Sequence, residues 1–326
     1  MGTEKSRIVL SVGGNALTMG PGRETIQDQR EAAAMAARIV ANVFRSGAKT
    51  ALTHGNGPQS GFIMRRFEFA HQHGVLHPVP LDAVVADTQG AIGYMLEQLI
   101  HDELHGVDPE KAERIATLVT QAIVDPNDPA FKNFSKPVGE WMTEKEADEH
   151  RAQEGWAVSL MKEGVERGWR RVVASPEPIG VTNAAAIRHN FEGGFLTICG
   201  GGGGIPVIRK PDGSLKGAPA VIDKDSITRV IASIVRADLM AVLTAAPGVI
   251  DPEEFKRKHE QGAIIPVLKV SEARGMLPDL QKGSMGPKVK ACSDFTAETG
   301  EDSLITDFPH ALEALQGQGG TRIVAD

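Results

Sequence analysis

The 326-residue chain contains only two cysteines, Cys199 and Cys292, and a single tyrosine, Tyr94. Two cysteines are too few for a disulfide framework and are compatible with a reducing compartment. The chain also lacks a hydrophobic leader at its N-terminus and any apolar run long enough to span a bilayer. We therefore expect a soluble, cytoplasmic protein.

An excess of positive charge is missing as well. The chain has 35 Lys and Arg against 42 Asp and Glu, a net charge of −7. This balance gives no electrostatic footprint for nucleic acid or an anionic membrane, so neither is an expected partner. If the ligand is an anion, the positive charge that binds it must be local. The 41% of hydrophobic residues is ordinary for a globular protein with a sizeable core.

Short β-branched runs alternate with longer amphipathic runs along the chain. The pattern predicts strands at 7–12, 49–55, 115–124, 170–175, 195–200 and 303–306, and helices at 25–47 and 81–106. Residues 220–244 read as a further helix followed by a strand. This rhythm predicts an α/β fold, a three-layer αβα sandwich in which helices cover both faces of a mainly parallel open sheet.

Residues 125–171 break the rhythm. They are rich in Pro and charge and contain all three tryptophans of the chain, Trp141, Trp156 and Trp169. The segment is too polar for a central strand and too aromatic for a linker. We interpret it as a small protruding subdomain, at about 126–171, that could close over a site. A surface insertion without a role is the alternative.

Three glycine-rich loops follow predicted strands. They contain Gly13, Gly14 and Asn15, then Gly55, Asn56, Gly57 and Pro58, and then five consecutive glycines, Gly200 to Gly204. Glycines at the carboxyl ends of parallel strands let backbone N–H groups approach phosphate oxygens, and three such loops would converge on one crevice. Neither a P-loop nor a dinucleotide-binding motif accounts for them. Each loop alone can be a tight turn; together they indicate a phosphate site.

Lysines beside Gly or Pro turns can supply the missing positive charge. Lys224 and Asp225 lie in "VIDKDS", Lys288 in "GSMGPKVKA", and Lys136 in "FSKPVG" of the protrusion. Any one of them can be a solvated surface lysine. However, a cation at a helix start is unfavourable unless a ligand anion compensates, so their placement favours a phosphate ligand.

The chain resembles the carbamate kinases, of the amino acid kinase fold. The resemblance covers about residues 7 to 321 and rests on eight blocks that occur in the family's order. The blocks are "GGNAL", "THGNGPQ", "PLDAVVADTQGAIGYML", "DPAFKNFSKPVG", "GWRRVVASPEP", "CGGGGGIPV", "AVIDKD" and "GSMGPKVKA".

The resemblance implies reversible transfer of the γ-phosphoryl group of ATP to carbamate, which gives ADP and carbamoyl phosphate. It implies an acceptor lobe at 1–195, including the subdomain, and a nucleotide-binding lobe at 196–326. Magnesium would be carried on the nucleotide phosphates rather than by protein side chains. It further implies a cytoplasmic homodimer that usually forms ATP during arginine or related nitrogen catabolism.

The resemblance also implies roles for individual residues. The catalytic cations would be Lys136, Lys224 and Lys288, with Asp225 as the carboxylate that orients them. The loops that bind substrate and phosphate would contribute Gly13, Gly14, Asn15, Gly55, Asn56, Gly57, Gly201, Gly202 and Gly203. The nucleotide would be bound by Lys224, Thr244, Met285, Pro287 and Lys288.

Two segments depart from the family pattern. The family's run usually has four glycines before Ile-Pro, and the fifth glycine here either lengthens the loop or is absorbed in the turn. Residues 245–265 replace an acidic turn and a tyrosine element with "AAPGVIDPEEFKRKHEQGAII". This change puts the adenine and ribose contacts in question. A kinase of another small carboxylate or carbamate-like acid, and a non-catalytic subunit that binds nucleotide or carbamoyl phosphate, are therefore the alternative functions.

The remaining polar clusters favour simpler readings. His71, His73 and His77 lack nearby cysteines or organised carboxylates, which predicts a loop rather than a metal site. His101 and His105 lie one helical turn apart in "HDELH", which is not the H-E-x-x-H motif. We expect no metal ligands among the protein side chains and interpret Cys199 as a small buried thiol.

Overall fold

The central element of the fold is an eight-stranded sheet that is parallel except for one antiparallel pair, β14 with β15. The computed structural model describes residues 6–20, 22–163, 166–251, 263–280 and 285–326. The order across the sheet is β13, β15, β14, β12, β1, β2, β9 and β3. In chain order these strands are β1 (Arg7–Val12), β2 (Lys49–His54), β3 (Ile115–Thr117), β9 (Leu196–Ile198), β12 (Leu239–Thr244), β13 (Val267–Lys269), β14 (Asp302–Asp307) and β15 (Thr321–Val324).

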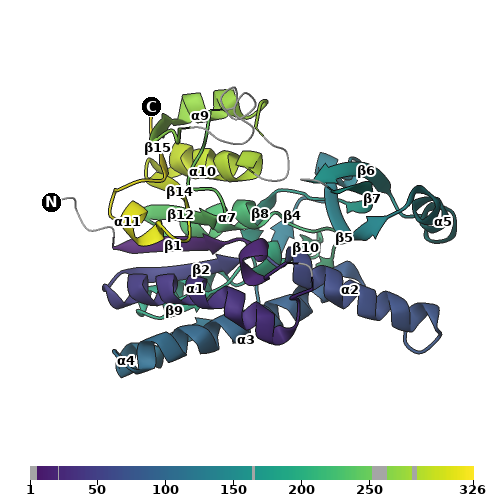
Figure 1. Cartoon of the computed structure of the whole chain (residues 1–326), viewed down its shortest axis with the longest axis horizontal. Helices are drawn as coiled ribbons and strands as arrows, with labels where there is room; N and C mark the ends of the chain where they lie inside the picture. Colours follow the sequence, from purple (N-terminus) through teal and green to yellow (C-terminus); the bar gives the residue numbers. More distant parts are fainter. Residues whose placement is uncertain (1–5, 21, 164–165, 252–262, 281–284) are drawn as a thin grey trace.

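Helices cover both faces of this sheet (Figure 1). The α-helices are α1 (Ile26–Arg45), α2 (Gly57–Gln72), α3 (Leu81–His105), α4 (Pro109–Ala112), α5 (Glu144–Glu154), α6 (Ala184–Glu192), α7 (Lys224–Val235), α9 (Val270–Met276), α10 (Met285–Thr299) and α11 (Ala311–Leu315). Short 3-10 helices are η1 (Gly14–Leu17), η2 (Pro129–Phe131) and η3 (Gly201–Gly203). No described helix is both long enough and apolar enough to cross a membrane.

The alternation of side chains in β1 shows how the two faces are built. Ile8, Leu10 and Val12 point into one core with α1, α3 and α11, whereas Val9 points into the other core with α6, α7, α9 and α10. Successive residues of a strand face opposite sides of a sheet, so a strand buried on both sides is apolar at nearly every position. The structure therefore confirms the predicted three-layer αβα class. Ser11, on the α7 side, is the buried polar exception in this strand.

Two smaller sheets complete the structure. One has the order β11, β10, β4 and β8, and the other has the order β5, β7 and β6. Their strands are β4 (Gln121–Val124), β5 (Lys136–Met142), β6 (Val158–Glu163), β7 (Glu166–Val173), β8 (Pro178–Val181), β10 (Ile205–Arg209) and β11 (Leu215–Gly217). The antiparallel sheet of β5, β7 and β6 and helix α5 project from the body beside α2 (Figure 1).

This projection is the expected subdomain, and aromatic contacts hold it together. Trp156 stacks on His150 with ring centroids 4.1 Å apart, and the Arg171 guanidinium lies 4.4 Å from the Trp156 ring centroid on the side of β7. Arg171 also reaches Glu68 of α2 at 3.8 Å. The subdomain is thus a packed unit with a polar contact to the body at its base.

Candidate active site

The glycine loops after β1, β2 and β9 meet at one end of the main sheet, as their positions in the sequence predict. A Cβ atom on Gly55 would lie 2.6 Å from the backbone nitrogen of Gly14, and one on Gly14 would lie 2.9 Å from that of Gly57. A Cβ atom on Gly202 would lie 2.3 Å from the side-chain nitrogen Nδ2 of Asn56. The loops approach one another more closely than side chains would allow, so glycine is required where they touch.

The five-glycine run lies at the centre of this contact. Gly200, Gly202, Gly203 and Gly204 all have positive φ, between 63° and 92°. Gly201 has ordinary φ, but a Cβ atom there would lie 2.4 Å from Nε2 of His54. Every one of the five positions therefore has a backbone or packing reason to be glycine, the fifth included.

Buried polar side chains fix the position of the glycine run. Gln89 of α3 donates through Nε2 to the carbonyls of Gly201 at 2.9 Å and Thr120 at 3.0 Å, and its Oε1 accepts from Thr120 N. His54 interacts through Nδ1 with the Gly55 carbonyl at 3.0 Å. Burial lowers the pKa of His54 from 6.5 to about 4, so this ring is neutral near pH 7.

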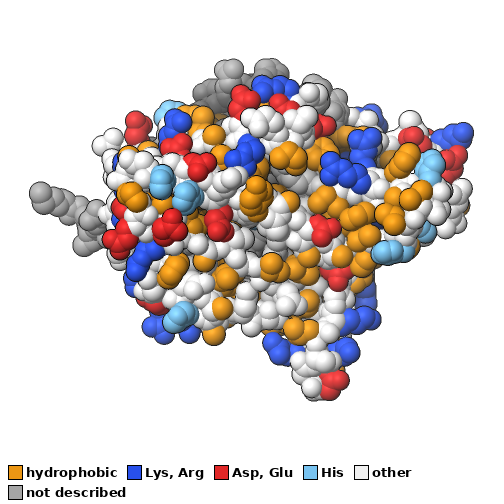
Figure 2. Space-filling model, turned by 90° about the horizontal axis from the view of Figure 1, so that it is seen from below, with side chains coloured by type: hydrophobic (Ala, Val, Ile, Leu, Met, Phe, Trp, Pro, Cys, Tyr) orange, Lys and Arg blue, Asp and Glu red, His pale blue; other side chains and the backbone are white. Residues whose placement is uncertain are grey.

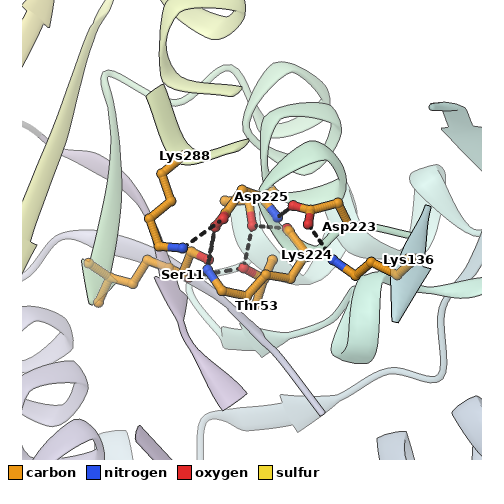
Figure 3. Close-up of polar contacts among 9 residues, drawn as sticks. Ser11, Thr53, Lys136, Asp223, Lys224, Asp225 and Lys288 are labelled. Atoms are coloured by element: carbon orange, nitrogen blue, oxygen red, sulfur yellow. Dashed lines mark hydrogen bonds and ion pairs between the residues drawn. The ribbon is translucent and has the colours of Figure 1, made fainter. Parts of the chain in front are cut away.

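Two lysines from different helices share one buried carboxylate (Figure 3). Lys224, the first residue of α7, donates through Nζ to Asp225 and, at 3.1 Å, to Ser11 Oγ of β1. Lys288, in the first turn of α10, lies with Nζ 3.5 Å from the other oxygen of Asp225. The Asp225 side chain is only 2% exposed and each lysine side chain 13%.

The stem of Lys224 lies across the glycine loops that follow β1 and β2. Its Cδ is 3.3 Å from the position of a Cβ atom on Gly55, and its Cε is 3.8 Å from that of a Cβ atom on Gly13. The α7 helix begins here because the Asp223 side chain accepts from the backbone N–H of Asp225, which is an N-cap contact. Lys224, which lies in the second half of the chain, therefore contacts the glycine loops of the first half.

Lys136 has a different carboxylate partner. The family resemblance implies that Asp225 orients all three lysines, but Lys136 Nζ donates to Asp223 Oδ2 at 2.7 Å. Burial acts to raise the pKa of Asp223, but the charges of Lys136 and Lys224 outweigh it and hold that pKa well below its usual range. Asp223 is therefore ionised at any pH at which the protein would be assayed.

The cluster as a whole is positive. Its members are three ammonium groups, Lys136, Lys224 and Lys288, and two carboxylates, Asp223 and Asp225, which leaves a formal charge of +1. Burial lowers the pKa of Lys288, and the like charge of Lys224 lowers it further, while Asp225 acts in the opposite direction. A buried site with excess positive charge is suited to an incoming anion.

The other predicted site residues lie on neighbouring elements. Thr244 ends β12, the strand next to β1 in the sheet, and Met285 and Pro287 lie with Lys288 in the first turn of α10. Asn15 contributes backbone to η1, and its side chain lies outside what is described. Of the altered segment 245–265, residues 252–262 lie outside the described residues.

Sequence reasoning missed three side chains that shape the site, Ser11, Asp223 and Gln89. Ser11 and Gln89 are buried polar residues, and Asp223 is half-buried. Ser11 could have been singled out from the sequence, because a polar residue inside a buried strand needs a hydrogen-bond partner and so indicates a nearby polar site. The partner of Ser11, Asp225, is 214 positions away and could not be read from the pattern.

Neither cysteine belongs to the cluster of lysines and aspartates. Both cysteines are buried, which raises the pKa of each thiol to about 12. Within the described ranges there is no group of three or more His, Cys, Asp or Glu side chains placed to hold a metal ion. The carboxylates of Asp223 and Asp225 are instead engaged by lysines.

Comparison with known proteins gives consistent relatives. The family model for the amino acid kinase family matches residues 6–307. A carbamate kinase of Thermococcus kodakarensis is 38% identical over 98% of this chain and 99% of its own, and one of Clostridium perfringens is 38% identical with the same coverage. The solved structure of a carbamate kinase from Giardia lamblia bound to AMP-PNP superposes with a TM-score of 0.86 at 35% identity, and the whole of each chain is covered.

These relatives match the chain over nearly all of its length. The family match alone spans far more than half of the sequence. The chain belongs to the amino acid kinase family, and it is a carbamate kinase-like member of that family.

Proposed function

We propose that the chain catalyses the reversible transfer of the γ-phosphoryl group of ATP to carbamate, which forms ADP and carbamoyl phosphate. The observation that carries the proposal is the position of Lys224. Its ammonium is held by Asp225 and Ser11, while its stem crosses the Gly13 and Gly55 loops. One lysine thereby joins the loops assigned to the acceptor with the helices assigned to the nucleotide.

The chemistry requires charge neutralisation more than proton transfer. Carbamate is already an anion, so its oxygen attacks the γ-phosphorus directly, and the bond from that phosphorus to the ADP oxygen breaks. Two like charges about 4 Å apart repel by roughly 4 kcal/mol at an effective dielectric constant near 20. In this proposal Lys136, Lys224 and Lys288 place ammonium groups beside the reactants, where they offset this repulsion and stabilise charge on the transferring group.

In this proposal Asp225 acts on the lysines rather than on the substrate. Its two oxygens contact Lys224 and Lys288, and its side chain is nearly inaccessible to solvent. It fixes the two ammonium groups relative to each other, and a general base is not required. The loops of Gly13, Gly14 and Gly55 would hold the acceptor. Thr244, Met285 and Pro287 would frame the nucleotide with Lys224 and Lys288.

Magnesium is proposed to enter with the nucleotide. Mg²⁺ keeps several waters and takes phosphate oxygens together with one or two carboxylates at most. Because Asp223 and Asp225 are engaged by lysines, we assign most of the coordination to the phosphates. Bound in this way, the ion would neutralise phosphate charge that the three lysines do not reach.

The first test is ATP formation from carbamoyl phosphate and Mg-ADP. We expect turnover by the wild-type protein and loss of most of it in Lys224→Ala. Lys216→Ala removes an exposed lysine of β11 from the same half of the chain and serves as the matched control, with activity unchanged. Near-normal kcat in a folded Lys224→Ala variant would remove that lysine from the mechanism.

Ala245, Ala246 and Pro247, which follow β12, favour one alternative, an altered substrate or nucleotide preference. A panel of small carboxylates and nucleotides tests it. A clear preference for carbamoyl phosphate in the ATP-forming direction would exclude another acceptor. Nucleotide binding by calorimetry without turnover would instead favour a non-catalytic subunit. The intact lysine cluster supports the catalytic reading.

We further propose a cytoplasmic homodimer that associates through the outer face of α1 and α3. Figure 2, which views the molecule from below relative to Figure 1, shows hydrophobic side chains scattered among polar ones on the face where α3 lies. Met35 of α1 and Tyr94 of α3 are 52% and 63% exposed. Light scattering of Tyr94→Glu should show a shift toward monomer. Phe69→Glu changes an equally exposed aromatic residue, at 64%, on α2 and should leave the mass unchanged.

A further inference from the structure

Asp223 connects two parts of the candidate site, and no role in the proposed reaction has been assigned to it. Its Oδ1 accepts the backbone N–H of Asp225 at 2.9 Å, and its Oδ2 accepts from Lys136 Nζ at 2.7 Å. Figure 3 shows the carboxylate between the Lys136 side chain and the first turn of α7. One residue thus caps the helix that begins with Lys224 and holds a lysine from another element.

Lys136 needs such a partner because of where its backbone lies. It is the first residue of β5, at the base of the subdomain, and its backbone pairs with Val173 of β7. Its side chain must reach from the subdomain toward α7. A lysine side chain is flexible and rotates through many conformations unless its ammonium group is held. The ion pair with Asp223 fixes the end of that side chain, which is 31% exposed.

The cap does not by itself require a carboxylate. Asn, Asp and Ser are about equally good N-cap residues, because any of them offers an oxygen to the first backbone N–H groups. The negative charge is needed for the other contact, with the Lys136 ammonium. It also lies within the field of Lys224, so it reduces the repulsion between two ammonium groups gathered at one helix start.

We propose that Asp223 is a positioning residue for phosphoryl transfer, which holds the Lys136 ammonium at the start of α7 where it meets the transferring group. This inference rests on the proposed function, because Lys136 is taken as one of the catalytic cations. Asp223 touches neither substrate in this scheme. It acts through Lys136, as Asp225 acts through Lys224 and Lys288.

A double-mutant cycle in kcat tests the proposal. Asp223→Asn keeps an oxygen for the helix cap and removes the charge, and a misplaced catalytic group can cost about 10²-fold in rate. We expect a loss of that order in Asp223→Asn. When Lys136 is already changed to Met, the same substitution should have little further effect on kcat. Asp212→Asn removes another carboxylate that accepts a backbone N–H, in an exposed turn, and should leave kcat unchanged.

An equal loss of kcat in both backgrounds would overturn the proposal, because Asp223 would then act independently of Lys136. Urea unfolding, with Asp223→Ala added to the set, measures the cap separately. Asp223→Ala removes the cap oxygen and should lower stability by about 1 kcal/mol with or without Lys136, whereas Asp223→Asn keeps the cap.

A second readout does not depend on turnover. An acylating reagent that reacts with the unprotonated amine form of lysine is added to the full-length protein without substrates, and labelling of Lys136 is followed by mass spectrometry. Lys136 should react faster in Asp223→Asn than in the wild-type protein, with exposed Lys216 as the internal reference. An unchanged rate would overturn the pairing itself. A wild-type protein without ATP-forming activity would contradict the proposed function, and the labelling result would still decide whether Asp223 holds Lys136.

Discussion

Gly203 provides a sharp test of why the glycine run exists. In Gly203→Ala, the new Cβ atom would lie 2.1 Å from the backbone oxygen of Ile222 and 2.7 Å from its carbonyl carbon. Residue 203 also has φ of +92°. A left-handed conformation costs about 1–2 kcal/mol for a residue other than glycine. Overpacking against atoms that cannot rotate away adds about 1–3 kcal/mol.

The expected destabilisation is therefore about 2–5 kcal/mol, a large part of the roughly 5–15 kcal/mol that stabilises a typical folded protein. Gly213→Ala is the matched control. Gly213 has φ of +85°, but no atom lies within 4 Å of the position of its Cβ. It should show the backbone cost alone, about 1–2 kcal/mol. Urea unfolding followed by circular dichroism measures both.

Activity provides a second measure of the same contact. Ile222 immediately precedes Asp223 and Lys224, so a shift of its carbonyl moves the start of α7 and the cluster that depends on it. Gly203→Ala should lower kcat as well as stability, whereas Gly213→Ala should leave kcat unchanged. If the two variants unfold within about 0.5 kcal/mol of each other, the usual spread of innocuous surface changes, the contact with Ile222 does not dictate glycine at 203.

Three further predictions concern titrating groups. The pKa of His54 is about 4 in the folded protein and 6.5 for an ordinary histidine, as in the unfolded chain. Between pH 4 and pH 6.5 the unfolded chain therefore binds more protons than the folded protein. Stability should therefore fall by up to about 3 kcal/mol as the pH drops from 6.5 to 4, and His54→Asn should flatten this slope in urea titrations. Lys288 must be protonated to act, and its pKa is below 10.5. The fall of kcat/KM at alkaline pH should thus have its midpoint below pH 10.5, and Lys288→Arg should move that midpoint to higher pH. An unchanged midpoint would show that another group causes the fall. Cys199 and Cys292 should react with a thiol reagent only after unfolding; fast reaction of the native protein would contradict their burial.

The sequence was informative where a pattern is local. The apolar run of 7–12 predicts β1 at Arg7–Val12, and the stretch 81–106 predicts α3 at Leu81–His105. The run of 115–124 was less informative, because it reads as one strand but forms two. At Leu118 the backbone N–H donates to Ile198 O of the main sheet, and the chain then passes through Thr120 into a different sheet. Neither Gly nor Pro marks that change of direction.

The site was predictable to the extent that chemistry shows in residue type. Glycine at strand ends and lysine at helix starts are unusual enough that the sequence alone indicates phosphate. The partners within the site were not predictable, because they depend on which segments fold together. Lys136 and Asp223 are 87 positions apart, and only the arrangement of the subdomain on α7 brings them into contact. The fifth glycine likewise has a reason only once Ile222 and Ala122 are placed against the run.

The place of β1 at the middle of the main sheet has a consequence for synthesis of the protein. Its neighbours are β2, made soon afterwards, and β12, which begins at Leu239. Contacts such as that of Arg7 with Asp238 span 231 positions. At about 5–20 residues per second, one edge of β1 stays without its native partner for about 10–50 s on the ribosome. An unpaired apolar strand edge is prone to wrong pairing, so nascent chains that stop before β12 should be the ones that recruit chaperones.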